Sequence, residues 1–329
     1  VRVLALNPIS DLSTVGRIGF EKLLHNFRLL GRLVPALRWA DAVYITPGAQ
    51  GLALRRDQLL TRLCQQFKRP YVLHHHCSQY GESDRGENLT KQQTSALQKT
   101  TQHAAGHLLL GDSLRSGFEG FLSSAMPTVS VENGVPIPAS ETPEPNGPIR
   151  LGFLGNLIHY KGFTDALAIL ARLPGIQLEV VGGFTEARYK TRTMKLLSDL
   201  DLEQRVHFHG PHYGEDAWSR LADTHLLLFT SNWREGLPLV WLESLARGLP
   251  VLSTDIGMAA EVLAPIDPRM VQSIGDHEAF ASAVRSLTED GADYTALRQR
   301  CRRVAVQKYS TDAWVERMIK ALDQLLFSS

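Results

Sequence analysis

Hydrophobic positions in the first 137 residues alternate between short continuous runs and helical spacing. Val1–Asn7 is a short apolar run that predicts a buried strand, and Ile18–Leu33 places apolar residues three and four positions apart, which predicts a helix. The alternation continues, with strands expected at Ala42–Thr46, Tyr71–His76, His107–Gly111 and Thr128–Glu132 and helices at Gln58–Phe67, Lys91–His103 and Ser113–Leu122. This order favours a parallel sheet with helices on both faces.

The pattern restarts after a proline-rich segment, residues 138–148, where four prolines lie close to acidic residues, Asn146 and Gly147. Such a composition predicts an exposed, stiff linker. We therefore expect an N-terminal α/β domain at 1–137, the linker at 138–148 and a C-terminal α/β domain at 149–329. In the second domain we expect strands at Arg150–Leu154, Gln177–Val181, Val206–His209, His225–Thr230 and Pro250–Ser253, and helices at Gly162–Leu173, Glu186–Leu197, Asp216–Ala222, from Pro238 to Arg247, and near Glu278–Leu287.

The last segment, Thr311–Leu326, has an apolar stripe along one helical face, so it should dock against another part of the protein. Two doubly wound parallel-sheet domains that face each other create a cleft beyond the carboxyl ends of their strands. Ligands of such sheets bind in clefts of this kind.

Composition indicates a folded protein of ordinary kind. Of its 329 residues, 43% are hydrophobic and 21% are charged, which suits two hydrophobic cores. No run of about 18 apolar residues occurs, and the start has neither a basic leader nor a cleavage signal. Cys64, Cys77 and Cys301 are scattered, which argues against a disulfide framework or a cysteine metal site. We expect a soluble, cytoplasmic protein.

Charge is distributed unevenly between the two halves. Residues 1–137 hold 15 basic residues against 10 acidic ones, whereas the rest of the chain holds 20 against 24. A basic first half suggests an anionic partner, such as a phosphate-bearing acceptor or a membrane surface. Ordinary solvated lysines and arginines are the other interpretation, and the count does not separate the two.

The densest chemical signal is the segment from Ser231 to Glu243. Pro238 is expected as the first residue of a helix that ends before Gly248. The N-terminus of that helix would present open N–H groups to an anion such as a diphosphate, and these belong to Gly236, Leu237, Leu239 and Val240. Glu235 precedes the helix and Glu243 lies within it, so both carboxylates can border one cleft and accept hydrogen bonds from vicinal hydroxyls. By spacing alone, two glutamates favour an ordinary solvated surface, and only their combination with the glycine, the proline and the helix start points to a site.

A second element combines a glycine turn, Gly155-Asn156, with Lys161 just before the next expected helix. Lys161 is placed to reach a phosphate over the same cleft, although a solvated lysine at a helix start is the simpler alternative. The spacing differs from the GxGxxG of dinucleotide-binding folds, which disfavours a nicotinamide dehydrogenase.

Together these motifs resemble the retaining glycosyltransferases of family 4 (group 1), which have the GT-B fold of two Rossmann-like domains facing a cleft. Their E-x7-E signature matches Glu235 and Glu243. Further similarity lies in Asn133-Gly134-Val135-Pro136, in the stretch from Arg247 to Val251, and in Ser253 to Gly257 followed by Ala260 to Leu263. The resemblance covers nearly all of residues 130–329 and is looser before them.

The resemblance implies roles for individual residues of the second domain. Glu243 would hold the nucleotide ribose, Glu235 with the backbone of Gly236 and Leu237 would hold the donor sugar, and Lys161 would pair with the diphosphate. The turn that contains His209, Gly210 and His212 would border the base. The family usually has arginine where this chain has Asn156, which removes a phosphate contact, and Gly257-Met258 replaces a commoner Gly-Gly.

In the first domain the family's glycine-rich acceptor-side loop corresponds to the region of Gly16, which a plain strand-to-helix turn explains equally well. His74, His75 and His76 end a predicted strand, so His74 and His76 share one face, and three such residues make a poor metal cage. His76 falls where family members carry a histidine that points at the reacting sugar. The basic and apolar helix Ile18–Leu33 could rest on an anionic membrane, or simply pack on the core.

The resemblance implies transfer of a sugar from a nucleoside-diphosphate sugar to an acceptor hydroxyl, with retention and without a cofactor or metal. The expected partners are the donor and a glycan, glycolipid or lipid-linked acceptor in cell-surface polysaccharide or glycoconjugate synthesis, with no nucleic acid. The expected location is the cytoplasm, with peripheral contact to the membrane as an option. Two alternatives remain: a nucleotide-sugar epimerase, which needs no acceptor, and a non-catalytic homologue, which Asn156 makes worth considering.

Overall fold

The structure is a computed structural model that describes residues 31–48, 51–80, 88–123, 125–139 and 142–327. The chain divides into two compact units, one formed by Val1–Val131 with Met318–Ser329 and the other by Glu132–Arg317. The predicted strand Val1–Asn7 and most of the predicted helix Ile18–Leu33 lie outside the described residues.

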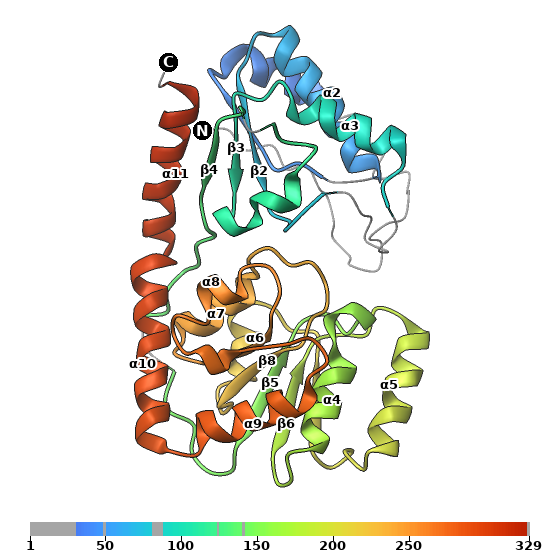
Figure 1. The fold of residues 1–329 in the computed structure, drawn as a ribbon, viewed down its shortest axis with the longest axis vertical. Helices are drawn as coiled ribbons and strands as arrows, with labels where there is room; N and C mark the ends of the chain where they lie inside the picture. Colours follow the sequence, from blue (N-terminus) through green and yellow to red (C-terminus); the bar gives the residue numbers. More distant parts are fainter. Residues whose placement is uncertain (1–30, 49–50, 81–87, 124, 140–141, 328–329) are drawn as a thin grey trace. The chain divides into compact units, whose positions relative to one another are not determined.

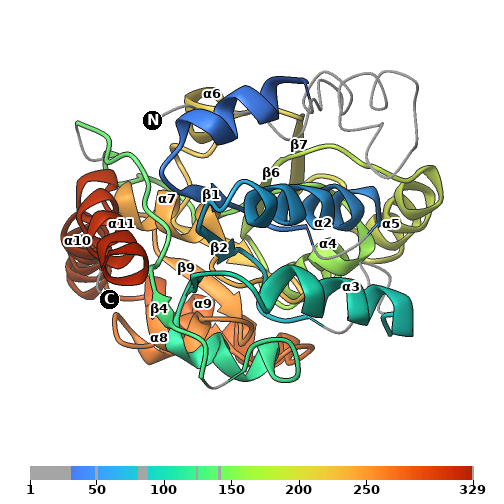
Figure 2. The ribbon, with the colours of Figure 1, turned by 90° about the horizontal axis from the view of Figure 1, so that it is seen from above.

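The first unit contains a parallel sheet in the order β1-β2-β3-β4 among its described residues. Helices α2 and α3 lie side by side next to this sheet (Figures 1 and 2). The elements are β1 (Val43–Ile45), α2 (Gly51–Gln66), β2 (Tyr71–His75), α3 (Lys91–Thr101), β3 (Gly106–Leu109), a 3₁₀ helix (Asp112–Phe118) and β4 (Thr128–Ser130). The expected strand positions are therefore confirmed within this unit where it is described.

Two helices of the first unit differ from expectation. Residues 31–39 are helical, so the helix predicted to end at Leu33 continues further. The side chain of Arg69 donates to the carbonyl groups of Leu37 and Arg38 and so satisfies the end of this helix. The helix predicted at Ser113–Leu122 is only a short 3₁₀ helix. It ends where Gly117 packs so closely that an added Cβ would lie 2.2 Å from the carbonyl oxygen of Ser78.

The second unit contains a six-stranded parallel sheet in the order β10-β9-β8-β5-β6-β7. The chain starts at a central strand, builds one half of the sheet through β6 and β7, and then crosses over to build the other half. Its strands are β5 (Arg150–Leu154), β6 (Gln177–Val181), β7 (Val206–Gly210), β8 (Leu226–Phe229), β9 (Val251–Thr254) and β10 (Val271–Gln272). The direction of winding reverses between β5 and β8, and open α/β sheets bind ligands at such a point.

Helices cover the sheet of the second unit, and the strands between them are apolar and buried. All four residues of β8 are buried, as expected for a parallel strand with helices on both faces. The helices of this unit are α4 (Phe163–Ala171), α5 (Ala187–Asp199), α6 (Gly214–Ser219), α7 (Leu239–Ala246), α8 (Ala259–Val262), α9 (His277–Thr288), α10 (Gly291–Lys308) and the first residues of α11 (Thr311–Leu326). The expected alternation of strands and helices in this half is confirmed.

The segment around residues 138–148 runs along α10. Arg302 donates to the carbonyl of Pro138 at 2.9 Å, and Thr295 donates to the carboxylate of Glu144 at 2.9 Å. The proline-rich segment is therefore held by side chains of α10.

The terminal helix α11 begins in the second unit, and its last residues belong to the first unit. Met318, Ala321 and Leu325 of this helix are buried. Gly106 of β3 lies against Leu325, since an added Cβ would approach that side chain to 2.4 Å. The apolar stripe seen in the sequence is therefore a packing face.

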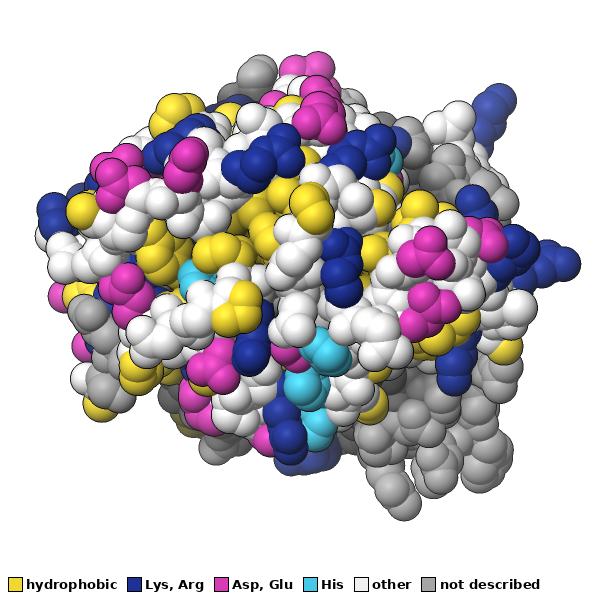
Figure 3. All heavy atoms as spheres, turned by 90° about the horizontal axis from the view of Figure 1, so that it is seen from below, with side chains coloured by type: hydrophobic (Ala, Val, Ile, Leu, Met, Phe, Trp, Pro, Cys, Tyr) yellow, Lys and Arg dark blue, Asp and Glu magenta, His cyan; other side chains and the backbone are white. Residues whose placement is uncertain are grey.

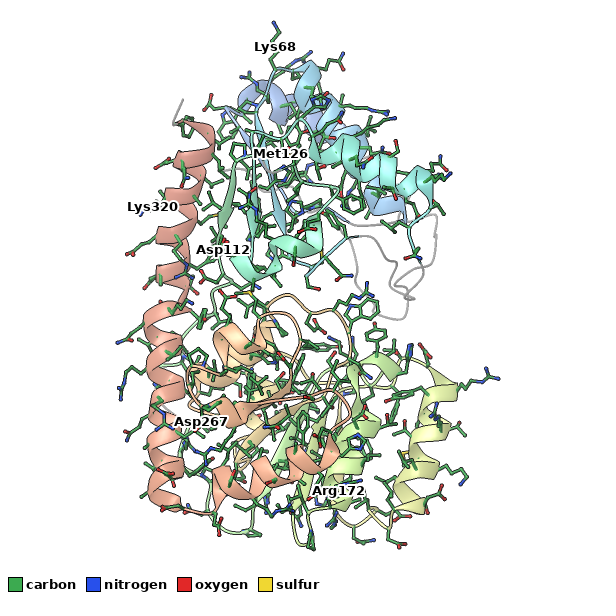
Figure 4. All side chains as sticks on the ribbon, in the orientation of Figure 1. Lys68, Asp112, Met126, Arg172, Asp267 and Lys320 are labelled. Atoms are coloured by element: carbon green, nitrogen blue, oxygen red, sulfur yellow. The ribbon has the colours of Figure 1, made fainter. Side chains whose placement is uncertain are left out.

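Two arginines of the second unit lie beside the carboxylate of Asp267, which Figure 4 labels. Arg269 donates to Asp267 at 2.7 Å and Arg300 lies 3.5 Å from the same carboxylate. The hydrogen bonds from Arg269 hold the pKa of Asp267 below its ordinary value.

Figure 3 shows one face of the molecule, where basic and acidic side chains are interspersed among hydrophobic ones. Within the described ranges, no helix has the length and apolar character needed to span a bilayer. The basic helix predicted at Ile18–Leu33 lies mainly outside those ranges, so its expected membrane contact stays a prediction.

Candidate functional site

The structure brings together two predicted site residues of the second unit that lie 74 positions apart. Lys161 follows β5 and Glu235 follows β8, and these strands are parallel neighbours whose carboxyl ends share one edge of the sheet. The ammonium group of Lys161 donates to Oε1 of Glu235, and the two side chains are only 28% and 18% exposed. A cation and a carboxylate thus meet at the point where the winding of the sheet reverses.

The position of Lys161 is fixed by the glycine that follows it. Gly162 has φ 69°, and an added Cβ would lie 1.8 Å from the carbonyl oxygen of Thr230 at the end of β8. The hydroxyl of Thr230 donates to the carbonyl of Gly162 at 2.7 Å. Glycine is required here because the turn after β5 presses directly against the backbone after β8.

A second glycine holds Glu235 and Gly236. Gly257 has φ 51°, and an added Cβ would lie 2.1 Å from the carbonyl oxygen of Glu235. The N–H of Met258 donates to the carbonyl of Gly236 at 3.1 Å. Met258 itself has φ −96° and a buried side chain, so a second glycine is unnecessary at that position, which accounts for the departure from Gly-Gly.

The helix behind this loop is α7, and its start differs by one residue from expectation. Pro238 has ψ 128° and precedes the helix, so the prediction that it is the first helical residue is wrong. The backbone of Pro238 is extended rather than helical, and its carbonyl accepts a hydrogen bond from the N–H of Trp241 at 3.2 Å. Pro238 therefore caps the helix instead of beginning it. Leu239 and Val240 are therefore the first helical residues, and their N–H groups have no acceptor among the described residues.

The N–H groups of Gly236 and Leu237 likewise have no acceptor among the residues that the structure describes. Asn133 donates its side-chain amide to the carbonyl of Leu237 at 3.0 Å, which ties this loop to the segment after the first unit. Four backbone donors expected to face an anion thus cluster at the start of α7, near the Lys161–Glu235 pair.

Glu243 lies one turn into α7 and is partly buried. The indole N–H of Trp218, in α6, donates to its Oε2 at 3.2 Å. Burial raises the pKa of Glu243 above its ordinary value, and the hydrogen bond from Trp218 acts in the opposite direction. Sequence reasoning missed Trp218, because nothing in a spacing of 25 residues signals its contact with Glu243.

The remaining predicted residues of this unit lie at the carboxyl ends of β5 and β7. Asn156 is exposed after β5. His209 shares a hydrogen bond with Glu179 of β6, at 2.7 Å between Nε2 and Oε2, so its ring is already engaged. His212 contacts Asp216 at 2.5 Å and the carbonyl oxygen of His209 at 3.0 Å. Gly210, between them, leaves open space where a Cβ would be.

In the first unit, Gly16 lies outside the described residues and His76 is exposed at the end of β2. The rings of His74 and His76 are 4.1 Å apart, which confirms that they share a face of the strand. His75 points elsewhere and forms a buried chain with Tyr80 at 2.7 Å and His107 at 3.0 Å.

Burial lowers the pKa of His74 to about 3 and that of His107 to about 4, and it lowers the pKa of His75 well below its ordinary value. These three rings are therefore neutral at physiological pH. Within the described residues, no group of three or more His, Cys, Asp or Glu side chains is arranged to hold a metal ion.

Comparison with known proteins places the chain in a family. Residues 139–308, just over half of the chain, match the sequence profile described as glycosyl transferases group 1. The chain belongs to this family. The matched range includes Lys161, Glu235 and Glu243, and the predicted resemblance is confirmed at the level of group 1.

Among curated relatives of this group 1 member, the "Lipopolysaccharide core biosynthesis glycosyltransferase LpsE" of Rhizobium meliloti (strain 1021) is 30% identical over 169 residues, 51% of this chain and 48% of LpsE. A "Glycogen synthase" of Mycobacterium tuberculosis (strain CDC 1551 / Oshkosh) is 30% identical over 173 residues, 50% of this chain and 39% of that protein. The chain spans about half the length of these relatives or less.

Solved structures share the fold. Anabaena Alr3699/HepE in complex with UDP aligns with a TM-score of 0.74 at 18% identity, over 90% of this chain and 82% of that one. Sucrose-phosphate synthase (tll1590) from Thermosynechococcus elongatus aligns with a TM-score of 0.76 at 19% identity, over 95% and 81%. The expected class, two Rossmann-like units with parallel sheets, is confirmed.

Proposed function

We propose that this group 1 member is a retaining glycosyltransferase that moves a sugar from a nucleoside-diphosphate sugar to an acceptor hydroxyl. The observation that carries the proposal is the Lys161–Glu235 pair beside the open N–H groups at the start of α7. This arrangement offers a positive charge and oriented backbone donors to a diphosphate, and a carboxylate to sugar hydroxyls.

Each side chain then has a distinct task in donor binding. Lys161 and the N–H groups of Leu239 and Val240 contact the diphosphate, and Glu235 with the backbone of Gly236 and Leu237 orients the transferred sugar. Glu243 accepts hydrogen bonds from the ribose. Asn156 borders the phosphates, and Gly210, with His209 and His212 on either side, borders the base.

The reaction follows from where charge develops. The bond between the anomeric carbon and the phosphate oxygen breaks, a bond to the acceptor oxygen forms on the same face, and the acceptor proton moves to the departing phosphate. Lys161 and the α7 N–H groups stabilise the negative charge on that leaving group, and no metal is needed for this step in our proposal. His76, with Gly16 on the acceptor side, positions the sugar.

The proposed acceptor is a glycan, a glycolipid or a lipid-linked sugar in cell-surface polysaccharide or glycoconjugate synthesis. The names of two relatives support this class, because LpsE and LpsB of Rhizobium meliloti are described as enzymes of lipopolysaccharide core biosynthesis. The excess of basic residues in 1–137 suits an anionic acceptor or the cytoplasmic face of a membrane. We propose that location for the protein.

Donor binding is the first measurement. The melting temperature of the full chain is measured with UDP, UDP-glucose, GDP and GDP-mannose in the presence of EDTA, because a ligand that binds only the folded form stabilises it. We expect one nucleotide series to raise the melting temperature, and Lys161→Ala and Glu243→Ala to lose most of that increase. Lys195→Ala, which removes the exposed Lys195–Asp199 pair of α5, serves as the control and should keep it.

The proposal fails if no nucleotide raises the melting temperature at millimolar concentration. It also fails if Lys161→Ala loses no more of the increase than Lys195→Ala does. Transfer itself is then tested by adding candidate lipid-linked and soluble sugars and following release of the nucleoside diphosphate. The anomeric configuration of the product, read by NMR, tests retention.

A further inference from the structure

The carboxylate of Glu243 is held from behind by side chains that the proposed function does not use. Trp218 is 6% exposed and donates its indole N–H to Oε2 of Glu243 at 3.2 Å. The other oxygen, Oε1, has no hydrogen-bond partner among the described residues. One oxygen of the carboxylate is thus fixed and the second is left to accept a ligand hydroxyl.

Arg247 locks this arrangement. It is the residue that follows α7, one turn after Glu243, and it donates to the carbonyl of Glu243 at 3.0 Å. Its guanidinium carbon lies 4.6 Å from the centre of the Trp218 ring and its other nitrogen pairs with Glu215 of α6. Arg247 is 7% exposed, so its guanidinium is shielded from water where it lies over the Trp218 ring, whereas the side chain of its partner Glu215 is 83% exposed.

The contacts also act on the charge of Glu243. Burial, and to a smaller degree the nearby carboxylate of Glu215, favour the neutral carboxyl of Glu243, whereas the indole N–H and the guanidinium both favour the carboxylate. An ionised carboxylate accepts hydrogen bonds at both oxygens, and a protonated one turns one oxygen into a donor. Trp218 and Arg247 therefore support the form of Glu243 that a diol requires.

We propose that Trp218 and Arg247 are positioning residues. They orient Glu243 so that its other oxygen, Oε1, accepts hydrogen bonds from the vicinal hydroxyls of the donor ribose. The proposal rests on the role of Glu243 in the proposed function. Neither residue touches the ligand in this arrangement. Their effect on donor binding passes through the carboxylate, so it should vanish for a ligand that lacks the two ribose hydroxyls.

The test is Trp218→Phe, which keeps an aromatic ring under Arg247 and removes the N–H donor. Trp241→Phe is the matched control, because Trp241 is buried in the same helix as Glu243 and its indole N–H has no partner among the described residues. The affinity of both variants is measured by calorimetry for whichever of UDP, GDP and ADP binds the wild type most tightly, and for its 2′,3′-dideoxy form.

We expect Trp218→Phe to weaken binding of the diphosphate about fivefold, as loss of one hydrogen bond would, and to leave the dideoxy form unchanged. The acid limb of diphosphate binding should move to higher pH, since a contact that favours the carboxylate is gone. Trp241→Phe should change neither the affinity for either ligand nor the pH profile of diphosphate binding.

Equal weakening of both ligands in Trp218→Phe, or no weakening of either, overturns the positioning role. If Glu243→Ala weakens the diphosphate while Trp218→Phe does not, the positioning role fails and the proposed function stands. If none of the three diphosphates binds the wild type, the proposed function itself fails.

Discussion

The buried histidines of the first unit predict a marked loss of stability in mild acid. His74, His75 and His107 are each no more than 1% exposed. Burial lowers the pKa of His74 to about 3 and that of His107 to about 4, and it holds the pKa of His75 well below its ordinary value. In the unfolded chain a histidine has a pKa of about 6.5. Between these values the unfolded chain binds protons that the folded unit does not.

The sign and size follow from this difference. Stability is highest above pH 6.5, where the rings are neutral in both states, and it falls as the pH drops toward the folded pKa values. The free energy of unfolding falls by about 1.36 kcal/mol per pH unit for each such histidine below pH 6.5. One histidine such as His107 therefore removes about 2 kcal/mol of stability at pH 5.0. This is a large fraction of the roughly 5–15 kcal/mol that stabilises a typical domain.

The assay is native-state hydrogen exchange of peptides that cover β2 and β3, at pH 7.5 and pH 5.0, with intrinsic rates corrected for pH. In the wild type we expect the opening free energy of these strands to fall by at least about 2 kcal/mol. In His107→Gln, which cannot take up a proton, the fall should be smaller by about 2 kcal/mol. His103→Gln, an exposed position of the same unit, is the control.

The reasoning is refuted if the wild type shows no fall between the two pH values, or if His107→Gln shows the same fall as the wild type and His103→Gln. Burial also lowers the pKa of His225 in the second unit, so a smaller fall is expected there. The two units should therefore differ in how far acid opens them.

Three further predictions concern the donor site. Gly162→Ala should have a melting temperature far below that of Gly175→Ala. Both glycines have positive φ, but only at Gly162 would an added Cβ lie 1.8 Å from a carbonyl oxygen. Thermal unfolding measures the difference, and equal melting temperatures would contradict the prediction. The Gly175 variant should lose only about 1–2 kcal/mol, the cost of a left-handed alanine. Asn156→Arg should bind a nucleoside diphosphate several-fold more tightly by calorimetry, since an exposed cation is added beside the phosphates; unchanged affinity would place the phosphates elsewhere. Gly257→Ala should abolish nucleotide-dependent stabilisation, because its Cβ would lie 2.1 Å from the carbonyl oxygen that fixes the donor loop, and a normal thermal shift would refute that.

The sequence predicted most of the architecture because burial leaves a local record. Continuous apolar runs such as Leu226–Phe229 and helical stripes such as that of Thr311–Leu326 identify buried strands and packing faces from neighbouring residues alone. Short elements rich in glycine were less predictable. The helix expected at Ser113–Leu122 is a 3₁₀ helix, because close packing of Gly117 against Ser78 is a contact that no local pattern contains.

For the candidate site, local patterns along the chain identified the residue types that are available: Lys161, Glu235 and Glu243 at spacings typical of the family, with glycines and a helix start among them. Which of these residues meet depends on how distant elements pack. The order of strands places β5 next to β8, so Lys161 reaches Glu235 across 74 residues, and the packing of α6 on α7 gives Glu243 its partner Trp218. Contacts at such separations are set by how whole elements pack. Closing a long loop costs entropy, and burial of whole strands and helices offsets that cost, whereas one pair of side chains does not.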